Sequence, residues 1–173
     1  MKLTLKIEGL DKLQAALGKV ASEAARKSMV DAAAQVLRQM SEQNFRSEKN
    51  RPAPWPALAQ STVRGLSKKR KKGAAKRTGG ARPLIDTGTL MRSLRIENVT
   101  GEGADLVSDR DYAGYHQFGS VKRANHPPAR PFVPVTGEYG GDLTPTPSAE
   151  KRMLRAAEDA LKAAAKAAGF KTS

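Results

Sequence analysis

The chain has 173 residues, the length of one domain, and carries a formal net charge of +14. It contains no cysteine, which excludes disulfides, thiolate metal sites and a cysteine nucleophile, and which is compatible with a reducing cytoplasm. Aromatic residues make up only 5% of the sequence, so we expect a small core that contacts with neighbouring subunits help to stabilise.

The first part of the chain predicts a strand followed by a long helix. Polar and apolar residues alternate over residues 2–7, which is the pattern of a half-buried strand. Residues 12–45 contain no proline and, after Gly18, no glycine, so we expect one helix that begins at a capping box of Asp11 and Gln14. We expect its apolar stripe to pack on the sheet, with a subunit interface along its second half as the alternative. The stripe there consists of Val30, Ala33, Leu37 and Met40.

Neither a signal peptide nor a membrane span is predicted. The alternating N-terminal residues are too few and too polar for a secretory signal. No run approaches the roughly 18 apolar residues of a membrane helix. We therefore expect a soluble protein that does not contact a membrane.

A long connection, residues 47–83, holds most of the excess charge, and we call it the basic loop. Between Lys49 and Arg82 there are eleven Lys or Arg residues and no Asp or Glu, which accounts for 11 of the net +14. The low-complexity composition of this stretch predicts a flexible loop. Its densest part, which we call the basic run, consists of Lys68, Lys69, Arg70, Lys71 and Lys72.

Three interpretations of the basic run remain open: a solvated loop, a docking arm for an acidic neighbour in an assembly, and a contact with nucleic acid. Aromatic residues are not interleaved with the charges, so base stacking is not supported. A contact with DNA would be made through phosphates and would be independent of sequence. Arg123, in a second basic loop, is a further candidate for contacts outside the subunit.

Trp55 is the only tryptophan and lies in a proline-rich stretch of the basic loop. The alternating prolines favour extended backbone geometry there. We favour an anchor that pins the loop to the domain through the large apolar area of the indole, with an intersubunit plug as the alternative. We also include Trp55 among the residues expected to contact partners.

A helical turn followed by a β-hairpin is predicted in the middle of the chain. Asp86 or Thr87 can cap the turn with a side-chain oxygen, while Leu90 and Leu94 fall on one of its faces. Residues 94–108 form two partly alternating stretches on either side of two glycines. This pattern is typical of a hairpin.

Residues 111–119 are predicted to form a short helical or turn-like segment. Tyr112, Tyr115 and Phe118 recur at a spacing of three, and we expect them to cap the hairpin and fill the end of the core. Gly119 follows this segment directly. We expect it to take a backbone conformation that a side chain would disfavour.

The sequence does not support a metal-binding or catalytic role for His116. The only other histidine is His126, in a proline-rich loop, and no carboxylate cluster accompanies the pair. No Ser/His/Asp spacing, phosphate-binding glycine loop or metal motif appears elsewhere. We therefore expect neither an enzyme nor a bound cofactor.

The C-terminal part predicts an edge strand, a linker and a helix. Residues 130–135 are predicted to form a strand at the edge of a sheet, because proline has no backbone N–H to donate to a neighbouring strand. Phe132 in this stretch is expected to be buried. Residues 136–147 form a linker rich in glycine and proline. The last helix is expected to open near Thr146, with Pro147 in its first turn, and to run to Ala168.

Several motifs follow one another along the chain. They are Trp55-Pro56-Ala57-Leu58 with Ser61-Thr62, then Leu84 with Thr87-Gly88-x-Leu90-x-x-Ser93-Leu94, then Tyr112-Ala113-x-x-His116-Gln117-Phe118-Gly119, then Pro128-Ala129-Arg130-Pro131-Phe132. In this order and spacing they resemble the phage virion morphogenesis family, the tail completion and neck proteins of Mu-like and related tailed phages. The sequence departs from the family pattern after Phe132, where relatives often run almost straight into a helix.

The resemblance implies an α+β fold in which a long N-terminal helix and a C-terminal helix pack on a small antiparallel sheet, with a long basic loop. Residues 1–135 would form the tail-completion or neck-like domain, with the flexible basic loop at 47–83. The linker 136–147 and a C-terminal helix within 148–173 would follow. The residues that we assign to the structural motif are Leu90, Leu94, Tyr112, His116, Phe118, Gly119, Arg130 and Phe132.

The function that the resemblance implies is that of a structural virion protein of a tailed phage, made in the host cytoplasm. It would act in tail completion or head–tail joining as a ring, expected to be a hexamer, at the neck or tail end. Its partners would be further copies of itself and adjoining neck, connector or tail-tube proteins, with DNA phosphate as an additional contact. The alternatives are a basic nucleic-acid-binding protein and an assembly chaperone that is absent from the finished particle.

Overall fold

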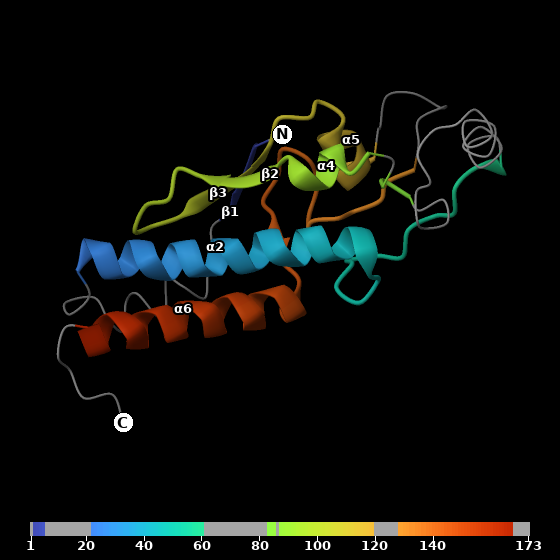
Figure 1. Cartoon of the computed structure of the whole chain (residues 1–173). Coiled ribbons are helices and arrows are strands. Elements are labelled where there is room, and N and C mark those ends of the chain that lie inside the picture. The colour runs from blue at the N-terminus through green and yellow to red at the C-terminus, as the bar shows by residue number, and fades with distance from the viewer. Residues whose placement is uncertain (1, 6–21, 61–82, 86, 120–127, 168–173) are drawn as a thin grey trace.

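The computed structural model describes residues 2–5, 22–60, 83–85, 87–119 and 128–167. In Figure 1, the long helix α2 lies between the sheet and the second long helix, α6, which packs on the side of α2 opposite the sheet. This arrangement confirms the predicted α+β class. The elements in chain order are β1 (Lys2–Leu5), α2 (Glu23–Arg46), α4 (Thr89–Arg92), β2 (Leu94–Glu97), β3 (Ala104–Ser108), α5 (Ala113–Phe118), β4 (Val135–Thr136), β5 (Thr144–Pro145) and α6 (Pro147–Ala167).

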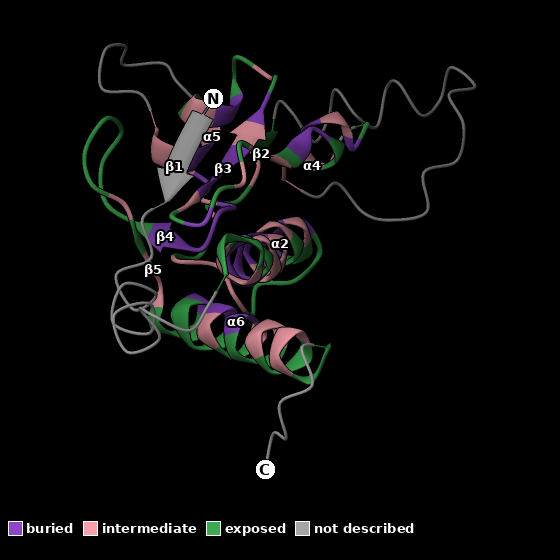
Figure 2. Cartoon of the chain, turned by 90° about the vertical axis from the view of Figure 1, so that its left-hand side faces the viewer, coloured by how far each residue is buried: buried purple, intermediate pink, exposed green. Residues whose placement is uncertain are grey.

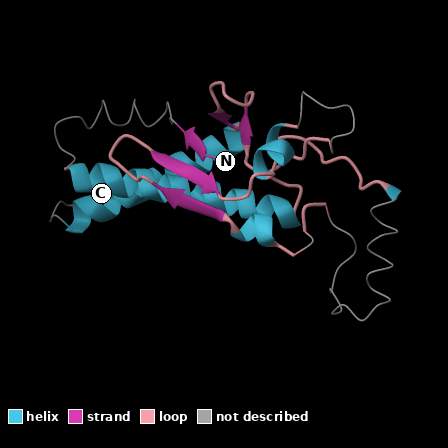
Figure 3. Cartoon of the chain, turned by 90° about the horizontal axis from the view of Figure 1, so that it is seen from above, coloured by secondary structure: helices cyan, strands magenta, loops and turns pink. Residues whose placement is uncertain are grey.

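The main sheet has the strand order β1-β3-β2, and both pairings are antiparallel. Leu106 in β3 lies opposite Leu3 on one side and Ile96 on the other. These pairings confirm the predicted N-terminal strand and the central hairpin. Seen from above, the strands run over α2 (Figure 3). Ala104 and Leu106, alternate residues of β3, line a cavity against α2, and Asp105 between them is also buried, at 5% exposed.

The core lies between the sheet and α2 and continues between α2 and α6, where buried residues concentrate in Figure 2. The predicted stripe of α2 is buried, with Val30, Ala33, Leu37 and Met40 between 0% and 2% exposed. A cavity between α2, the hairpin and α6 has a volume of only about 10 Å³. It has room for no more than one water molecule, so it is not a substrate site.

The helix α2 begins later than the sequence predicted. Ser22 is its N-cap, with an extended ψ of 156°, and its side chain accepts a hydrogen bond of 3.3 Å from the backbone N–H of Ala25. A residue with that ψ cannot lie inside a helix, so the prediction of one helix over residues 12–45 is wrong at its start. The predicted capping box at Asp11 lies outside the described residues.

The short helix α4 also starts differently from the prediction. Its N-cap is Gly88, in the left-handed conformation with φ of 73°, and no side chain caps the helix. Thr87 instead accepts a hydrogen bond of 3.3 Å from the N–H of Thr89, two residues ahead. The turn nevertheless places Leu90 and Leu94 in the core, each 4% exposed.

The segment predicted as a linker contains a two-stranded ribbon that leads into α6. Val135 pairs with Pro145, and Thr136 pairs with Thr144. The helix then opens at Pro147, as predicted, because the missing N–H of proline costs nothing in a first helical turn. Its buried residues recur every four positions and face α2: Ala149, Met153 and Ala157.

On this face of α6, Met153 is fully buried between two buried alanines and lines the same cavity as Val30, Ala34 and Leu37 of α2. The last described residue of α6 is Ala167, close to the predicted end, and the stop predicted at Gly169 falls outside the described part of the chain. No helix among the described residues has an apolar stretch long enough to cross a bilayer.

Candidate functional site

Three motif segments that are far apart in the sequence meet at the C-terminal end of α2. They are the stretch around Trp55, the helix α5, and Arg130 to Phe132. In Figure 1 this meeting point lies where α2 ends and the chain enters the basic loop. We call it the motif junction and define it by Asn44, Phe45, Trp55, Gln117, Arg130 and Phe132.

Aromatic rings form the centre of the motif junction. Phe45, in the last turn of α2, has its ring centroid 5.1 Å from that of Phe132 and 6.0 Å from that of Trp55. Phe45 and Phe132 are fully buried, as predicted for Phe132, while the indole of Trp55 is half-buried. The Phe45–Trp55 pair is edge-to-face at 81°, the geometry that the ring quadrupoles favour.

Polar contacts then fix the orientation of Trp55. Its indole Nε1 donates a hydrogen bond of 2.8 Å to the carbonyl oxygen of Pro131. The guanidinium of Arg51 lies 3.7 Å above the ring centroid, in a cation–π contact. The Nε of Arg51 also donates to the carbonyl oxygen of Asn44 at 2.8 Å, which satisfies a carbonyl at the end of α2. This geometry supports the anchor interpretation of Trp55.

Gln117 joins α5 to the segment after Arg130. Its buried Oε1 accepts hydrogen bonds of 2.9 Å from the N–H groups of both Phe132 and Val133, and its Nε2 donates to the carbonyl of Val133 at 3.1 Å. Asn44 donates from Nδ2 to the carbonyl of Phe132 at 2.8 Å. The backbone groups of this segment therefore bond to side chains instead of to a strand.

The predicted edge strand at residues 130–135 is accordingly wrong for most of its length. Only Val135, with Thr136 after it, has strand geometry. Proline is compatible with an edge strand, but here a buried glutamine satisfies the backbone in place of a neighbouring strand. The result is an irregular segment whose backbone groups bond to the side chains of Gln117 and Asn44.

Arg130 connects the same segment to the start of the basic loop. The side chain is 5% exposed, and it donates from Nε to the carbonyl of Pro56 at 3.2 Å and from Nη2 to the carbonyl of Ala57 at 3.1 Å. Its own backbone N–H donates to the carbonyl of His116 at 2.7 Å. Burial lowers the pKa of the Arg130 guanidinium from its ordinary value.

His116 is placed for a structural role. Its imidazole packs against the edge of Tyr112, with ring centroids 5.9 Å apart, and its buried Nδ1 has no hydrogen-bond partner among the described residues. Burial, and secondarily the positive charge of Arg130, lower the pKa of His116 below its ordinary value. Within the described ranges there is no group of three or more His, Cys, Asp or Glu residues that could hold a metal.

The tyrosines at α5 are more exposed than we expected. Tyr112 is 43% exposed and Tyr115 is 52% exposed, so neither fills the core, and only Phe118 packs partly against it. The core at this end is already occupied by Phe45 and Phe132. Tyrosine can face water because its hydroxyl is polar.

Gly119, which follows α5, has the positive φ that we expected, at 80°. A Cβ at this position would lie 3.4 Å from the Cβ of Ala129, an ordinary contact. The requirement for glycine therefore comes from the backbone conformation and not from lack of space.

The remaining predicted contact residues lie outside the described part of the chain: Lys68, Lys69, Arg70, Lys71, Lys72 and Arg123. The described residues that flank residues 61–82 and 120–127 lie toward the end of the molecule that holds the motif junction (Figure 1). The junction therefore anchors the described start of the basic loop, through Trp55, Pro56 and Ala57.

Sequence reasoning missed three residues of the junction, Asn44, Phe45 and Gln117. It also missed Arg51, which contacts Asn44 and Trp55 of the junction. A signal existed for Asn44, because it continues the buried stripe of α2 four residues after Met40, and a polar residue on an apolar stripe needs a buried partner. Gln117 lies within one of the motifs, but no periodic pattern of apolar residues around it indicates that it is buried. Arg51 appears in the sequence only as one charge among eleven.

The comparison with protein-family models matches the phage virion morphogenesis family over residues 8–162. Neither the comparison with curated proteins nor that with solved structures returns a match. The matched range includes every segment of the motif junction and most of α6, so it extends beyond the motifs that carry the resemblance in the sequence. The chain belongs to the phage virion morphogenesis family, and its role is in building the phage particle.

Proposed function

We propose that this protein is a structural component of the tailed-phage virion that acts in tail completion or head–tail joining, as a ring at the neck or tail end. The observation that carries the proposal is the motif junction. There, the motif residues of a virion morphogenesis protein bond to one another and fix the start of a strongly basic loop.

An enzyme site keeps polar groups available for a substrate, whereas most polar side-chain groups of the junction bond to the chain itself, the exception being the buried Oδ1 of Asn44. Gln117 makes three hydrogen bonds to two residues, and Arg130 bonds to two carbonyls of the loop. A rigid base that presents a charged loop favours binding to neighbours in an assembly. The neighbours that suit this role are further copies of the chain and adjoining neck, connector or tail-tube proteins.

The first test is an inventory of purified particles by mass spectrometry, with the copy number of the protein, together with native mass spectrometry of the isolated protein. We expect a small copy number equal to the subunit number of a closed ring, for which a hexamer is the expected form. Absence from particles would overturn the structural role and leave a chaperone that acts only during assembly.

A second test changes the basic run while leaving the domain intact. Replacing all five residues Lys68 to Lys72 by Gln should leave the thermal unfolding midpoint unchanged but stop the production of infectious particles. The matched control replaces five exposed basic residues of α6 by Gln, which changes the net charge equally. These are Lys151, Arg152, Arg155, Lys162 and Lys166. Normal infectivity of the basic-run variant, or equal loss in the control, would contradict the proposal.

A nucleic-acid-binding role is the second candidate, and the eleven Lys and Arg residues between Lys49 and Arg82 favour it. If the five residues of the basic run contact phosphates, the logarithm of the binding constant for duplex DNA should fall with log salt at a slope of about −4.5. Failure of duplex DNA to retain the protein at low salt would exclude this candidate.

A further inference from the structure

All three tyrosines of the chain are exposed, and they belong to neighbouring elements. Tyr112 and Tyr115 stand at the start and middle of α5, and Tyr139 lies in the loop between β4 and β5, where it is 74% exposed. The ring of Tyr139 packs on that of Phe118 at the end of α5, with centroids 5.6 Å apart. Figures 2 and 3 show the β4–β5 ribbon beside α5.

These four residues, Tyr112, Tyr115, Phe118 and Tyr139, form one surface, which we call the tyrosine face. The spacing of three along α5 keeps its aromatic side chains on one side of the helix. The exposure is selective, because Phe45 and Phe132 are fully buried. Exposed tyrosines that cluster in this way are typical of protein interfaces, since a rigid ring contributes a large contact area at a low entropic cost.

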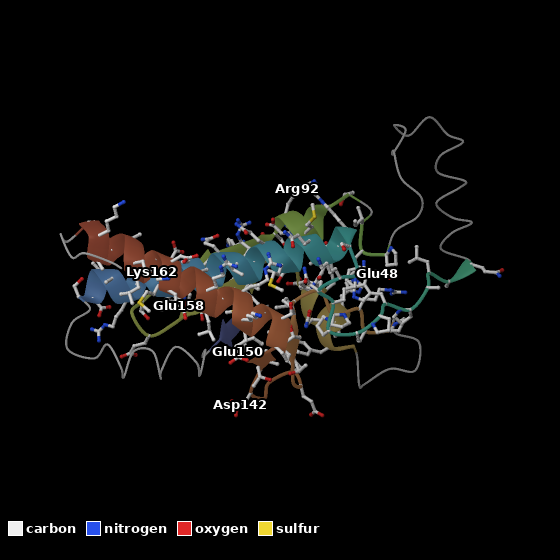
Figure 4. The ribbon with its side chains drawn as sticks, turned by 90° about the horizontal axis from the view of Figure 1, so that it is seen from below. Glu48, Arg92, Asp142, Glu150, Glu158 and Lys162 are labelled. Carbon is white, nitrogen blue, oxygen red and sulfur yellow. The ribbon has the colours of Figure 1, made fainter. Side chains whose placement is uncertain are left out.

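Acidic residues border the tyrosine face. Glu138 and Asp142 flank Tyr139 in its loop, and Asp111 precedes Tyr112; all three carboxylates are exposed. Figure 4 shows Asp142 projecting from the body of the domain. From Pro131 to Glu150 the sequence contains three acidic residues and no Lys or Arg. Tyrosine rings edged by carboxylates bind Lys and Arg side chains, through cation–π contacts and ion pairs.

The chain itself carries the complementary segment. From Arg64 to Arg82 there are nine Lys or Arg residues and no Asp or Glu. The described residues that lead into it, Pro56 to Gln60, are mostly exposed and run away from the helices and strands (Figure 1). The described start of the basic loop thus leaves the helices and strands at the motif junction, where Trp55, Pro56 and Ala57 are held.

We propose that the basic run of one copy docks on the tyrosine face of the next copy. This inference rests on the proposed ring and names the contact that would close it. A ring requires a heterologous interface, in which two different surfaces of each subunit meet, and the basic run and the tyrosine face are two such surfaces of opposite charge.

Disulfide cross-linking tests the contact directly, because the natural chain has no cysteine to interfere. One preparation carries Arg70→Cys and the other Asp142→Cys; after mixing and mild oxidation we expect a cross-linked dimer. In the control, Lys162→Cys on the outer side of α6 replaces Asp142→Cys, and we expect little cross-linking (Figure 4). No cross-link at Asp142, or equal cross-linking at Lys162, would overturn the inference.

A charge exchange distinguishes contact between copies from contact within one copy. One variant changes the five residues of the basic run to Glu, and the other combines Asp111→Lys, Glu138→Lys and Asp142→Lys. Each variant alone should lose the oligomer in native mass spectrometry, and the mixture should regain it. Assembly of either variant alone as in the natural protein, or failure of the mixture to assemble, would overturn the inference.

The two proposals fail in different ways. Absence of the protein from particles would overturn the proposed virion function whatever the cross-link shows. A ring present in particles that forms no cross-link between positions 70 and 142 would leave that function standing and overturn only the docking of the basic run on the tyrosine face.

Discussion

The indole Nε1 of Trp55 donates a hydrogen bond of 2.8 Å to the carbonyl oxygen of Pro131, across a separation of 76 residues. With the ring contact to Phe45, this bond ties the start of the basic loop to the end of α2 and to the segment before β4. Trp55 is therefore one side chain that contacts both other parts, beside the links made by Asn44, Phe45 and Arg130.

Replacing Trp55 by Ala should lower the free energy of unfolding by about 2 to 3 kcal/mol, because a half-buried ring and a hydrogen bond are both lost. Trp55→Phe keeps most of the apolar area and should cost about 1 kcal/mol, the value of the hydrogen bond. Urea unfolding followed by circular dichroism measures both. If Trp55→Ala kept full stability but failed to assemble, Trp55 would be an intersubunit plug and not an anchor.

Gln117→Leu should be among the most destabilising single changes in the chain. It leaves the buried N–H groups of Phe132 and Val133 without an acceptor, at a cost of about 1 to 3 kcal/mol for each. We expect a loss of about 2 to 5 kcal/mol in urea unfolding. The control is Gln39→Leu on the exposed side of α2, which should stay within about 0.5 kcal/mol of the natural protein. Similar values for the two variants would show that the segment has another acceptor.

Gly119→Ala should cost about 1 to 3 kcal/mol, because φ of 80° with ψ of −175° is a region that is essentially restricted to glycine. The new methyl group would meet only ordinary contacts at Ala129, so the loss would report backbone strain. Gly141→Ala serves as the control, since that glycine lacks a positive φ and should tolerate the change within about 0.5 kcal/mol. The shift in thermal midpoint, converted with the measured unfolding enthalpy, gives both values.

The lowered pKa of His116 makes stability depend on pH in a definite direction. The unfolded chain binds a proton at the ordinary pKa of 6.5, while burial and Arg130 disfavour protonation in the folded state. The unfolded state therefore holds more protons below about pH 6.5, so stability is fully present above that pH and falls as the pH drops toward the lower folded pKa.

His116→Gln should remove this contribution, because the amide does not titrate in the range. The measurement is the difference in unfolding free energy between the natural protein and the variant, followed from pH 8 to pH 5. We expect the natural protein to lose stability relative to the variant as the pH falls. A difference that stays constant, or that changes in the opposite direction, would show that the imidazole is not desolvated in the fold.

Several features of the fold could be predicted from the backbone preferences and spacing of residues close together in the sequence. Pro147 at the first turn of α6 and the positive φ of Gly119 follow from backbone preferences of single residues. The buried stripe of α2 follows from helical periodicity. These features do not depend on distant partners, so the sequence by itself was sufficient to predict them.

The tertiary structure was needed to determine two kinds of feature. In one, a residue distant in the sequence bonds to backbone groups, and in the other, distant residues fill the part of the core that a side chain was expected to occupy. Residues 130–134 are not a strand because Gln117 supplies the acceptor that a neighbouring strand would have supplied. Tyr112 lies outside the core because Phe45 and Phe132 already occupy that end of it. The motif junction also depends on contacts between residues that are distant in the sequence. Its residues are spread from Asn44 to Phe132, and only the packing of α5 and the Arg130 segment against the end of α2 brings their hydrogen-bonding groups together.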